Sequence, residues 1–339
     1  MTMAEILLKT VHDDASDALL TVGVPPAYRI YGNYRFENEQ KLTAEGIFDM
    51  IREVVTPEQM ERFLSEKELD LAISYEGLRF RMNAFFQRGK PAVSLRSINN
   101  SVKNFETLGI PPILKTYCQK KRGLILVTGP TGSGKSTTLA AIVNQINQTR
   151  PCHIISIEDP IEYFHDNDRS IITQREVGTD TLSFASALRG ALREDPDVLL
   201  IGEMRDPETM ATAVTAAETG HLVISTLHTS GSVNTVDRII DSFPAAQQQQ
   251  IRSQLSMSLL CVVSQQLIPR KDGKGRVPAF EIMINTPAIS SLIRSGKTYM
   301  IASSIDTGTR DGMQSIASSL KNLAAKGIIS DEELRARLG

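Results

Sequence analysis

A glycine-rich segment carries the clearest chemical signal in this chain of 339 residues. Its nine residues are Gly129, Pro130, Thr131, Gly132, Ser133, Gly134, Lys135, Ser136 and Thr137. They fit the phosphate-binding pattern G-x-x-x-x-G-K-[ST] at every position. The glycines would let backbone N–H groups surround a phosphate, the Lys135 ammonium would contact the β- and γ-phosphates, and the Ser136 hydroxyl would bind Mg²⁺. The segment therefore predicts nucleotide binding.

The residues on either side supply the elements that such a loop requires. Leu124–Val127 is a short apolar run that predicts a buried strand, and 138–143 predicts a helix. The helix N-terminus would add a dipole that favours a bound phosphate. A flexible Gly/Ser turn is the alternative, and the flanking strand and helix argue against it.

Three carboxylates follow a predicted strand further along the chain. Glu158, Asp159 and Glu162 come at the end of the apolar run His153–Ile157. α/β sheets place ligands at the carboxyl ends of their strands. Phosphoryl transfer needs carboxylates that bind Mg²⁺ and orient the attacking water, so Asp159 is a candidate metal ligand. The alternative is that these residues are simply a polar connection at the end of the strand. The phosphate-binding loop earlier in the chain makes that alternative the less favoured interpretation.

Two more predicted strands end at polar residues. Val198–Ile201 leads to Glu203, which is the Walker B arrangement of a buried strand followed by an acid that acts on Mg²⁺. Leu222–Thr226 lies between His221 and His228. Seven residues of strand separate the two imidazoles by roughly 20 Å, too far to share one metal ion. We expect His228 to approach the γ-phosphate and His221 to make a structural hydrogen bond.

The order of the elements predicts two domains. Residues 1–100 read as a small domain that mixes helices and strands, and 101–113 reads as a linker rich in polar residues, Gly and Pro. Short strands alternate with helices in 114–339, which predicts an α/β parallel sheet covered by helices, followed by a helical tail from Gly312.

Two local patterns stand out in the first domain. Residues 56–59, Thr-Pro-Glu-Gln, predict a capped helix start. Leu78–Ala84 alternates strictly, which predicts a half-buried strand with Arg79 and Arg81 on its outer face. A solvated strand face is the simplest interpretation of this spacing.

Composition argues against several classes of protein. A net charge of −2 and a pI near 6.3 argue against a nucleic-acid binder. The three cysteines are scattered and form no C-x-x-C pair, which argues against a disulfide framework or a zinc ribbon and favours a reducing cytoplasm. Apolar runs are too short to cross a membrane, and the N-terminus lacks a secretory pattern.

Together these segments resemble the secretion-type hexameric ATPases that power type IV pili and type II secretion, with the best match in the pilus retraction subgroup. The similarity extends over nearly the whole chain, from residues 15–17 to 312–314. It rests on the order of four motifs, which are a Walker A loop at 129–137, an aspartate box at 157–163, a Walker B segment at 202–206 and a histidine box at 221–228.

The resemblance implies a RecA-like P-loop NTPase core joined to a smaller, PAS-like α+β N-terminal domain. It also implies an ATPase that uses ATP and Mg²⁺. Glu162 would activate or orient the attacking water, Glu203 would be the Walker B acid, and His228 would report on the nucleotide phosphates.

The resemblance also has implications for assembly. Arg79, Arg81 and Arg96 would reach ATP, at least partly across a subunit boundary. The partners would be further copies in a homo-hexamer, an inner-membrane pilus platform protein and a paralogous pilus ATPase, with no nucleic acid. The protein would be cytoplasmic, at the inner face of the membrane.

Two departures from the family pattern are visible. The early Ser-Asp-Leu-His-Leu segment reads Ser16–Leu20, Ser-Asp-Ala-Leu-Leu, without its histidine. The Ala-Ile-Arg-Asn-Leu motif of the retraction subgroup reads Ala288–Leu292, Ala-Ile-Ser-Ser-Leu, so that both of its polar recognition residues are replaced. The second departure bears on coupling to retraction more than on ATP hydrolysis.

The leading hypothesis is an ATPase motor that drives pilus disassembly and twitching motility. An accessory retraction ATPase remains open because of the altered 288–292 segment. An assembly or type II secretion ATPase usually carries an extra N-terminal region and a tetracysteine zinc insert, which we do not find here. A RecA-like nucleic-acid translocase conflicts with the near-neutral charge. A nucleotide-gated module without turnover conflicts with the carboxylates Glu162 and Glu203.

Overall fold

The computed structural model describes residues 1–30, 33–36, 40–98 and 102–338. Internal contacts divide the chain into two compact units, Met1–Ser101 and Val102–Gly339. Each unit has its own hydrophobic core. The predicted domain boundary at residues 100 and 101 lies outside the described residues.

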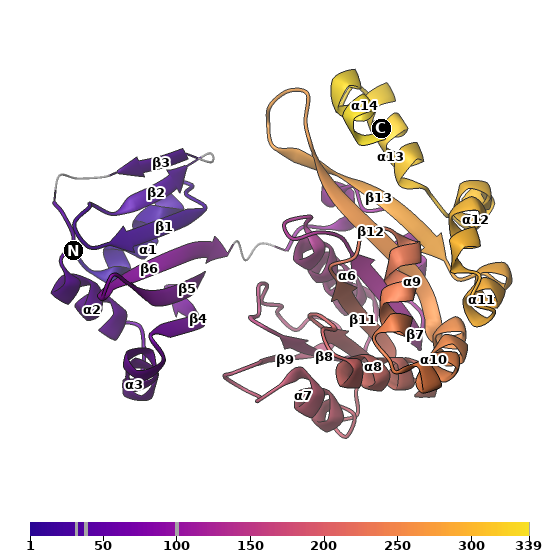
Figure 1. Cartoon of the computed structure of the whole chain (residues 1–339), viewed down its shortest axis with the longest axis horizontal. Helices are drawn as coiled ribbons and strands as arrows, with labels where there is room; N and C mark the ends of the chain where they lie inside the picture. Colours follow the sequence, from indigo (N-terminus) through magenta and orange to yellow (C-terminus); the bar gives the residue numbers. More distant parts are fainter. Residues whose placement is uncertain (31–32, 37–39, 99–101, 339) are drawn as a thin grey trace. The chain divides into compact units, whose positions relative to one another are not determined.

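The N-terminal unit is a six-stranded antiparallel sheet packed against helices, in the strand order β3-β2-β1-β6-β5-β4 (Figure 1). The strands are β1 (Asp17–Thr21), β2 (Ala27–Ile30), β3 (Asn33–Phe36), β4 (Glu68–Tyr75), β5 (Leu78–Gln87) and β6 (Lys90–Ile98). The helices are α1 (Met3–His12), α2 (Ala44–Arg52) and α3 (Pro57–Glu66). This is the smaller α+β domain that the sequence predicts.

The predicted capped helix start is confirmed, and the predicted half-buried strand is confirmed except at Arg79. Thr56 and Gln59 form a reciprocal capping box at the start of α3. Phe80, Met82 and Ala84 of β5 are fully buried because they face the helices, whereas the alternate residue Arg81 is exposed. Arg79 is only 7% exposed, which the alternation alone does not predict.

The C-terminal unit is built on a seven-stranded sheet in the order β13-β12-β7-β11-β10-β8-β9. Six strands are parallel and β13 alone runs antiparallel, as the partner of β12. The strands are β7 (Gly123–Thr128), β8 (His153–Glu158), β9 (Ile171–Glu176), β10 (Val198–Ile201), β11 (Leu222–Leu227), β12 (Leu259–Pro269) and β13 (Arg276–Ile284).

Helices cover this sheet, and the C-terminal ones follow the β12–β13 hairpin (Figure 1). The helices before the hairpin are α4 (Phe105–Leu108), α5 (Ile113–Cys118), α6 (Lys135–Thr149), α7 (Phe184–Ala191), α8 (Pro207–Thr219), α9 (Ser232–Asp241) and α10 (Ala245–Ser258). Those after it are α11 (Pro287–Arg294), η1 (Thr298–Met300), α12 (Ile301–Thr307), η2 (Gly308–Asp311), α13 (Ile316–Ala325) and α14 (Asp331–Leu338).

The central strands are the ones that the sequence predicts. Every residue of β7, β10 and β11 is buried, because parallel strands covered on both faces need continuous apolar runs. The predicted α/β class, a mostly parallel sheet covered by helices, is therefore confirmed. Strands β9, β12 and β13, which extend the sheet at both edges, were not predicted.

The structure does not show a linker at 102–113, the described part of the segment predicted as one. This part belongs to the second unit and contains helix α4, which begins at an Asn104 cap. Phe105 and Ile110 are buried in the core of that unit. The polar residues of this segment suggested a linker, but its spaced apolar side chains pack against the sheet domain.

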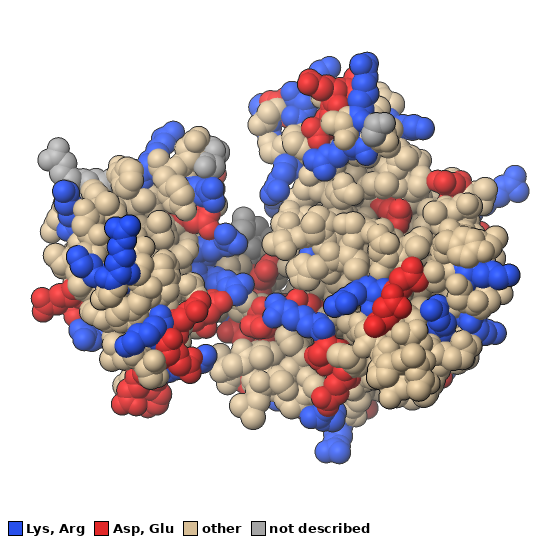
Figure 2. Space-filling view, viewed as in Figure 1, with Lys and Arg blue, Asp and Glu red and all other residues tan. Residues whose placement is uncertain are grey.

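The predicted tail helices are present, and the surface around them carries both signs of charge. Ser330 caps α14 by accepting a hydrogen bond from the Glu333 N–H at 3.1 Å. Figure 2 shows basic and acidic side chains interspersed over α13 and α14 on the face in view. In the part of the chain that the structure describes, no helix is long and apolar enough to span a bilayer.

Candidate nucleotide-binding site

The glycine-rich loop connects β7 to α6 at the centre of the C-terminal sheet. Gly129 has φ +145°, and a Cβ atom there would lie 2.3 Å from the Gln265 carbonyl oxygen, so only glycine fits. Helix α6 begins directly after Gly134, and no side chain of the described residues caps its N-terminus. Its first N–H groups are therefore available to a phosphate.

Lys135 lies inside this loop. Its Nζ donates to the carbonyl oxygens of Gly129 at 2.9 Å and Pro130 at 3.1 Å. Burial lowers the pKa of Lys135, and the negative charges of Glu203 and Glu162 oppose that shift. The structure thus brings the lysine and the two predicted catalytic carboxylates within electrostatic reach of one another.

One buried polar atom in the loop indicates that the loop suits an oxyanion. The Ser133 hydroxyl oxygen is buried and has no hydrogen-bond partner among the described residues. A buried hydroxyl without a partner costs about 1–3 kcal/mol, which a phosphate oxygen would offset. Together with the N–H groups of α6, this orphaned hydroxyl makes the loop a fitting site for a nucleotide phosphate.

Glu203 is held at the exit of β10 by its neighbours in the sheet. The Gly202 N–H donates to the Ile157 carbonyl oxygen of β8 at 2.8 Å, and the Met204 N–H donates to the Thr226 carbonyl oxygen of β11 at 3.2 Å. A Cβ atom at Gly202 would be 3.3 Å from the Ile157 oxygen, so glycine allows this close approach. The backbone on both sides of Glu203 is therefore fixed.

The two histidines take different roles. His228 Nε2 lies 3.2 Å from Glu203 Oε2, and Arg205 pairs with the other carboxylate oxygen. His221, at the opposite end of β11, has Nδ1 3.1 Å from the Ala216 carbonyl oxygen. The expected structural hydrogen bond of His221 is confirmed, and of the two histidines it is His228 that contacts the candidate site residue Glu203.

The three carboxylates after β8 differ in environment. Burial raises the pKa of Glu158 to about 7, and its Oε1 accepts a 2.8 Å hydrogen bond from Ser156. Asp159 and Glu162 are exposed. Within the described residues the Asp159 carboxylate makes no hydrogen bond or ion pair. The Tyr163 hydroxyl lies 2.9 Å from Thr137 Oγ1, so this loop contacts the start of α6.

The donors around the loop suit Mg²⁺. The Ser136 hydroxyl and the carboxylates of Glu203 and Asp159 offer the oxygen ligands that this ion prefers. In the described residues no three His, Cys, Asp or Glu side chains gather as a metal cluster. Mg²⁺ at phosphate sites commonly uses one or two protein ligands plus the substrate phosphates, so this sparse set fits the ion.

The three predicted arginines share one face of the N-terminal sheet. Arg81 of β5 is directly opposite Arg96 of β6 in the antiparallel register, and Arg79 is two residues along β5. Side chains directly opposite one another lie on the same face. Arg81 pairs with Asp70 at 2.5 Å and Arg96 with Asp17 at 2.8 Å. Their action on a nucleotide stays a prediction.

Sequence reasoning missed Gln265, which supports the loop from β12. Its side chain is 3% exposed, and its Nε2 donates to the Ser133 carbonyl oxygen at 2.7 Å. Its Oε1 accepts from Thr138 Oγ1 at 2.7 Å. One amide therefore joins the end of the loop to the first turn of α6. The apolar run before it, Leu259–Val263, was a signal for a buried strand ending near the site.

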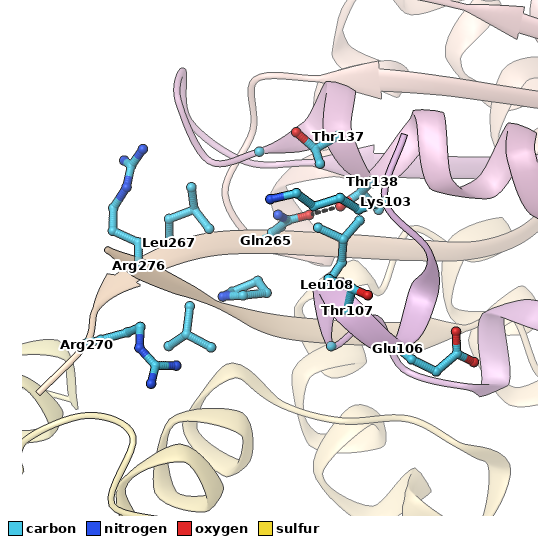
Figure 3. Close-up of a pocket in the computed structure, with 14 residues that line it drawn as sticks. Lys103, Glu106, Thr107, Leu108, Thr137, Thr138, Gln265, Leu267, Arg270 and Arg276 are labelled. Carbon is cyan, nitrogen blue, oxygen red and sulfur yellow. Dashed lines mark hydrogen bonds between the residues drawn. The ribbon is translucent and has the colours of Figure 1, made fainter. Parts of the chain in front are cut away.

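A cavity of about 400 Å³ adjoins the loop (Figure 3). Gly134, Thr137 and Thr138 form the wall next to the loop, residues around α4 form the second wall, and the β12–β13 hairpin forms the third. Three basic side chains line it, which are Lys103, Arg270 and Arg276. No local sequence pattern marks this cavity, because its walls come from the α4 segment and the β12–β13 hairpin, which are far apart in the chain.

A family model described as type II/IV secretion system protein matches residues 55–335. This range contains the whole loop, both acidic strand exits and His228. The match covers more than half of the chain and includes the candidate site.

Two curated relatives match over most of their length. A protein of Pseudomonas aeruginosa named type IV pilus retractation ATPase PilT is 47% identical over 338 residues, 99% of this chain and 98% of the relative. A twitching motility protein of Neisseria gonorrhoeae is 48% identical over 313 residues, 92% of this chain and 84% of the relative.

A solved structure also matches. The crystal structure of the pilus retraction motor PilT with bound ADP has a TM-score of 0.92 and 45% sequence identity, and the alignment covers 99% of this chain and 96% of that chain.

Proposed function

The chain belongs to the family of type II/IV secretion system proteins, and we propose that it is an ATPase motor that drives the retraction of type IV pili. The observation that carries this proposal is the end-to-end similarity to a pilus retraction ATPase, at 47% identity over 99% of this chain. The site geometry supports it, because the loop, Lys135, Glu203 and His228 lie together as ATP hydrolysis requires.

ATP would bind with its phosphates in the loop and its base and ribose in the adjoining cavity. The cavity begins at Gly134 and Thr137, directly beside the loop, and its volume of about 400 Å³ lies in the range of small-molecule sites. Ser136, Glu203 and Asp159 would hold Mg²⁺. The ion would neutralise charge that develops on the transferring phosphoryl group.

Glu162 would orient the attacking water, and His228 would report on the phosphates through its contact with Glu203. Exposure suits Glu162 to this role, because the carboxylate has to meet a water molecule. Burial disfavours the charged form of Lys135, and the negative charges of Glu203 and Glu162 partly offset this effect. The negative charge of a bound polyphosphate would stabilise the Lys135 ammonium in the same way.

The active form would be a homo-hexamer in which Arg79, Arg81 and Arg96 act on a nucleotide, at least partly across a subunit boundary. Their placement on one sheet face supports a joint role. In the cell, the motor would work on the cytoplasmic side of the membrane, against an inner-membrane platform protein of the pilus machinery and beside a paralogous pilus ATPase.

Two carboxamide variants of the full-length protein test the chemistry. Glu203→Gln and Glu162→Gln should leave nucleotide affinity largely intact, because each amide keeps an oxygen ligand and the phosphate-binding loop is unchanged. Turnover should fall by orders of magnitude, because the negative charge lost in each variant acts mainly in hydrolysis. ATPase activity measured against protein concentration, alongside light scattering, tests the assembly. Parental turnover in either variant would show that the carboxylate has no role in hydrolysis. A fully active monomer would refute the proposal that Arg79, Arg81 and Arg96 act across a subunit boundary.

An accessory retraction ATPase is the second candidate, favoured by the altered segment in α11. The Ser290 hydroxyl donates to the Ser256 carbonyl oxygen of α10 at 2.7 Å, and Ser291 is exposed. At the position where the retraction subgroup has an arginine, this chain therefore has a serine whose hydroxyl hydrogen-bonds to its own α10. The two candidates differ in whether this chain retracts pili when it is the sole retraction ATPase in the cell.

A further inference from the structure

The loop that carries Glu162 has no regular structure to hold it. The chain from residue 159 to 170, between β8 and β9, contains no helix or strand. Backbone N–H and C=O groups of such a segment need other partners when they are covered. The question is therefore what fixes the backbone beside an exposed carboxylate that has to orient a water molecule.

Strand β9 supplies those partners through two side chains. Glu176 Oε2 accepts a hydrogen bond from the Ile161 N–H at 3.0 Å. Gln174 Nε2 donates to the Tyr163 carbonyl oxygen at 2.9 Å, and Gln174 Oε1 accepts from the His165 N–H at 2.9 Å. The residues immediately before and after Glu162 are both held by β9.

The spacing of these contacts follows from strand geometry. Residues 174 and 176 lie on the same face of β9, because side chains alternate along a strand. Successive contacts fall on residues 161, 163 and 165, so the loop runs in extended fashion past the two side chains. Gln174 Nε2 also lies 3.3 Å from Glu158 Oε1, at the point where the loop leaves β8.

Both ends of this arrangement are themselves anchored. Glu176 is 8% exposed, and its own N–H donates to Asp180 Oδ2 at 2.8 Å in the turn that follows β9. On the other side of the loop, the Tyr163 hydroxyl lies 2.9 Å from Thr137 of α6. The backbone that carries Glu162 is thus fixed between the edge strand and the phosphate-binding helix.

We infer that Gln174 and Glu176 are positioning residues for hydrolysis, which fix the loop so that the Glu162 carboxylate faces the attacking water. The inference rests on the proposed role of Glu162. Neither side chain touches the substrate in this account. Each acts through the backbone of residues 161–165, and Gln174 also contacts Glu158 at the point where the loop begins. Reactions of this kind are sensitive to placement, and a displacement of about 1 Å can cost roughly 100-fold in rate.

Variants of the full-length protein separate this role from a merely structural one. Gln174→Met keeps the side-chain volume and removes both backbone contacts, and Glu176→Ala removes the third. Each should lower kcat about 10- to 100-fold while the dissociation constant for ADP changes less than about threefold. Glu176→Gln should retain kcat within about threefold, because the amide oxygen still accepts from Ile161.

Thr173→Val is the matched control. Thr173 lies on the opposite face of the same strand, where its hydroxyl contacts His153 Nε2 at 3.0 Å and not the loop. The substitution removes one hydrogen bond from β9 without touching residues 161–165, so kcat should stay near the parental value. If Glu176→Ala is too unstable to assay, Gln174→Met carries the test, because it preserves packing.

A double-mutant cycle with Glu162→Gln provides the decisive outcome. If Gln174 acts through Glu162, the effect of Gln174→Met on single-turnover hydrolysis should shrink to less than about twofold in that background. An equal loss in both backgrounds, an unchanged kcat in the single variant, or a large loss of ADP affinity would overturn the inference. Parental turnover in Glu162→Gln alone would instead refute the proposed role of Glu162.

Discussion

Replacing Gln265 by Leu should loosen the phosphate-binding loop. Leu has a similar volume but no amide, so the variant loses the 2.7 Å hydrogen bond to the Ser133 carbonyl oxygen and the 2.7 Å hydrogen bond from Thr138. Both partners lie in a buried environment around a side chain that is 3% exposed, and little water can replace the lost contacts.

The size of the effect follows from these two contacts. A buried polar group left without a partner costs about 1–3 kcal/mol, so two partners give about 2–6 kcal/mol. Burying the leucine side chain offsets about 1–2 kcal/mol of this, which leaves a net loss of about 0–5 kcal/mol in the free energy of unfolding, with a central value of about 2.5 kcal/mol. Nucleotide affinity should fall about tenfold, or about 1.4 kcal/mol, because binding must then order the loop.

Gln266→Leu is the control for this substitution. Gln266 is the next residue of β12, is half-buried, and makes no side-chain hydrogen bond within the described residues. Calorimetric unfolding of both variants gives their stabilities, and titration calorimetry with ADP gives their affinities. If Gln265→Leu unfolds at the same temperature as Gln266→Leu and binds ADP equally well, the assigned role of Gln265 in holding the loop is wrong.

Three further outcomes are expected. Lys135→Ala should abolish hydrolysis and weaken ATP binding, measured by phosphate release and calorimetry, because the phosphates lose their main cationic contact. Burial lowers the pKa of His165 to about 4, so between pH 7 and 5 the unfolded chain takes up a proton at this histidine and the folded chain does not. His165 should therefore lower the free energy of unfolding by about 2 kcal/mol over that range, and chemical denaturation of His165→Asn at both pH values should show a pH dependence smaller by that amount. Replacing Ser290 with Arg and Ser291 with Asn should leave purified ATPase activity within about threefold, a barrier change under ~0.7 kcal/mol, and a tenfold change would place the segment in the chemistry.

The part of the site that the sequence predicted is the part encoded locally. The loop, its strand and its helix are contiguous, so the pattern at 129–137 places Lys135 without knowledge of the fold. Glu203 and His228 were found because buried parallel strands have unmistakable apolar runs, and their polar exits must meet at one edge of the sheet.

The part that was missed depends on tertiary packing. Strand β9 has half-exposed polar residues and lies at the sheet edge, so it lacks the apolar run that identified its neighbours. Gln174 therefore carried no signal of its contacts with the Glu162 loop. The predicted linker was mistaken for a similar reason, because only the packed structure shows that Phe105 is covered by the core of the C-terminal unit.

The central claim is that this chain powers pilus retraction, and gene deletion in the source cell tests it most directly. Surface pili are counted by electron microscopy in the deletion strain and in strains complemented with the parental gene or with Glu162→Gln. The account predicts more pili and lost twitching motility in the deletion strain, with recovery only by the parental gene. A strain without pili would contradict retraction and indicate an assembly ATPase, and recovery by Glu162→Gln would contradict a role for hydrolysis.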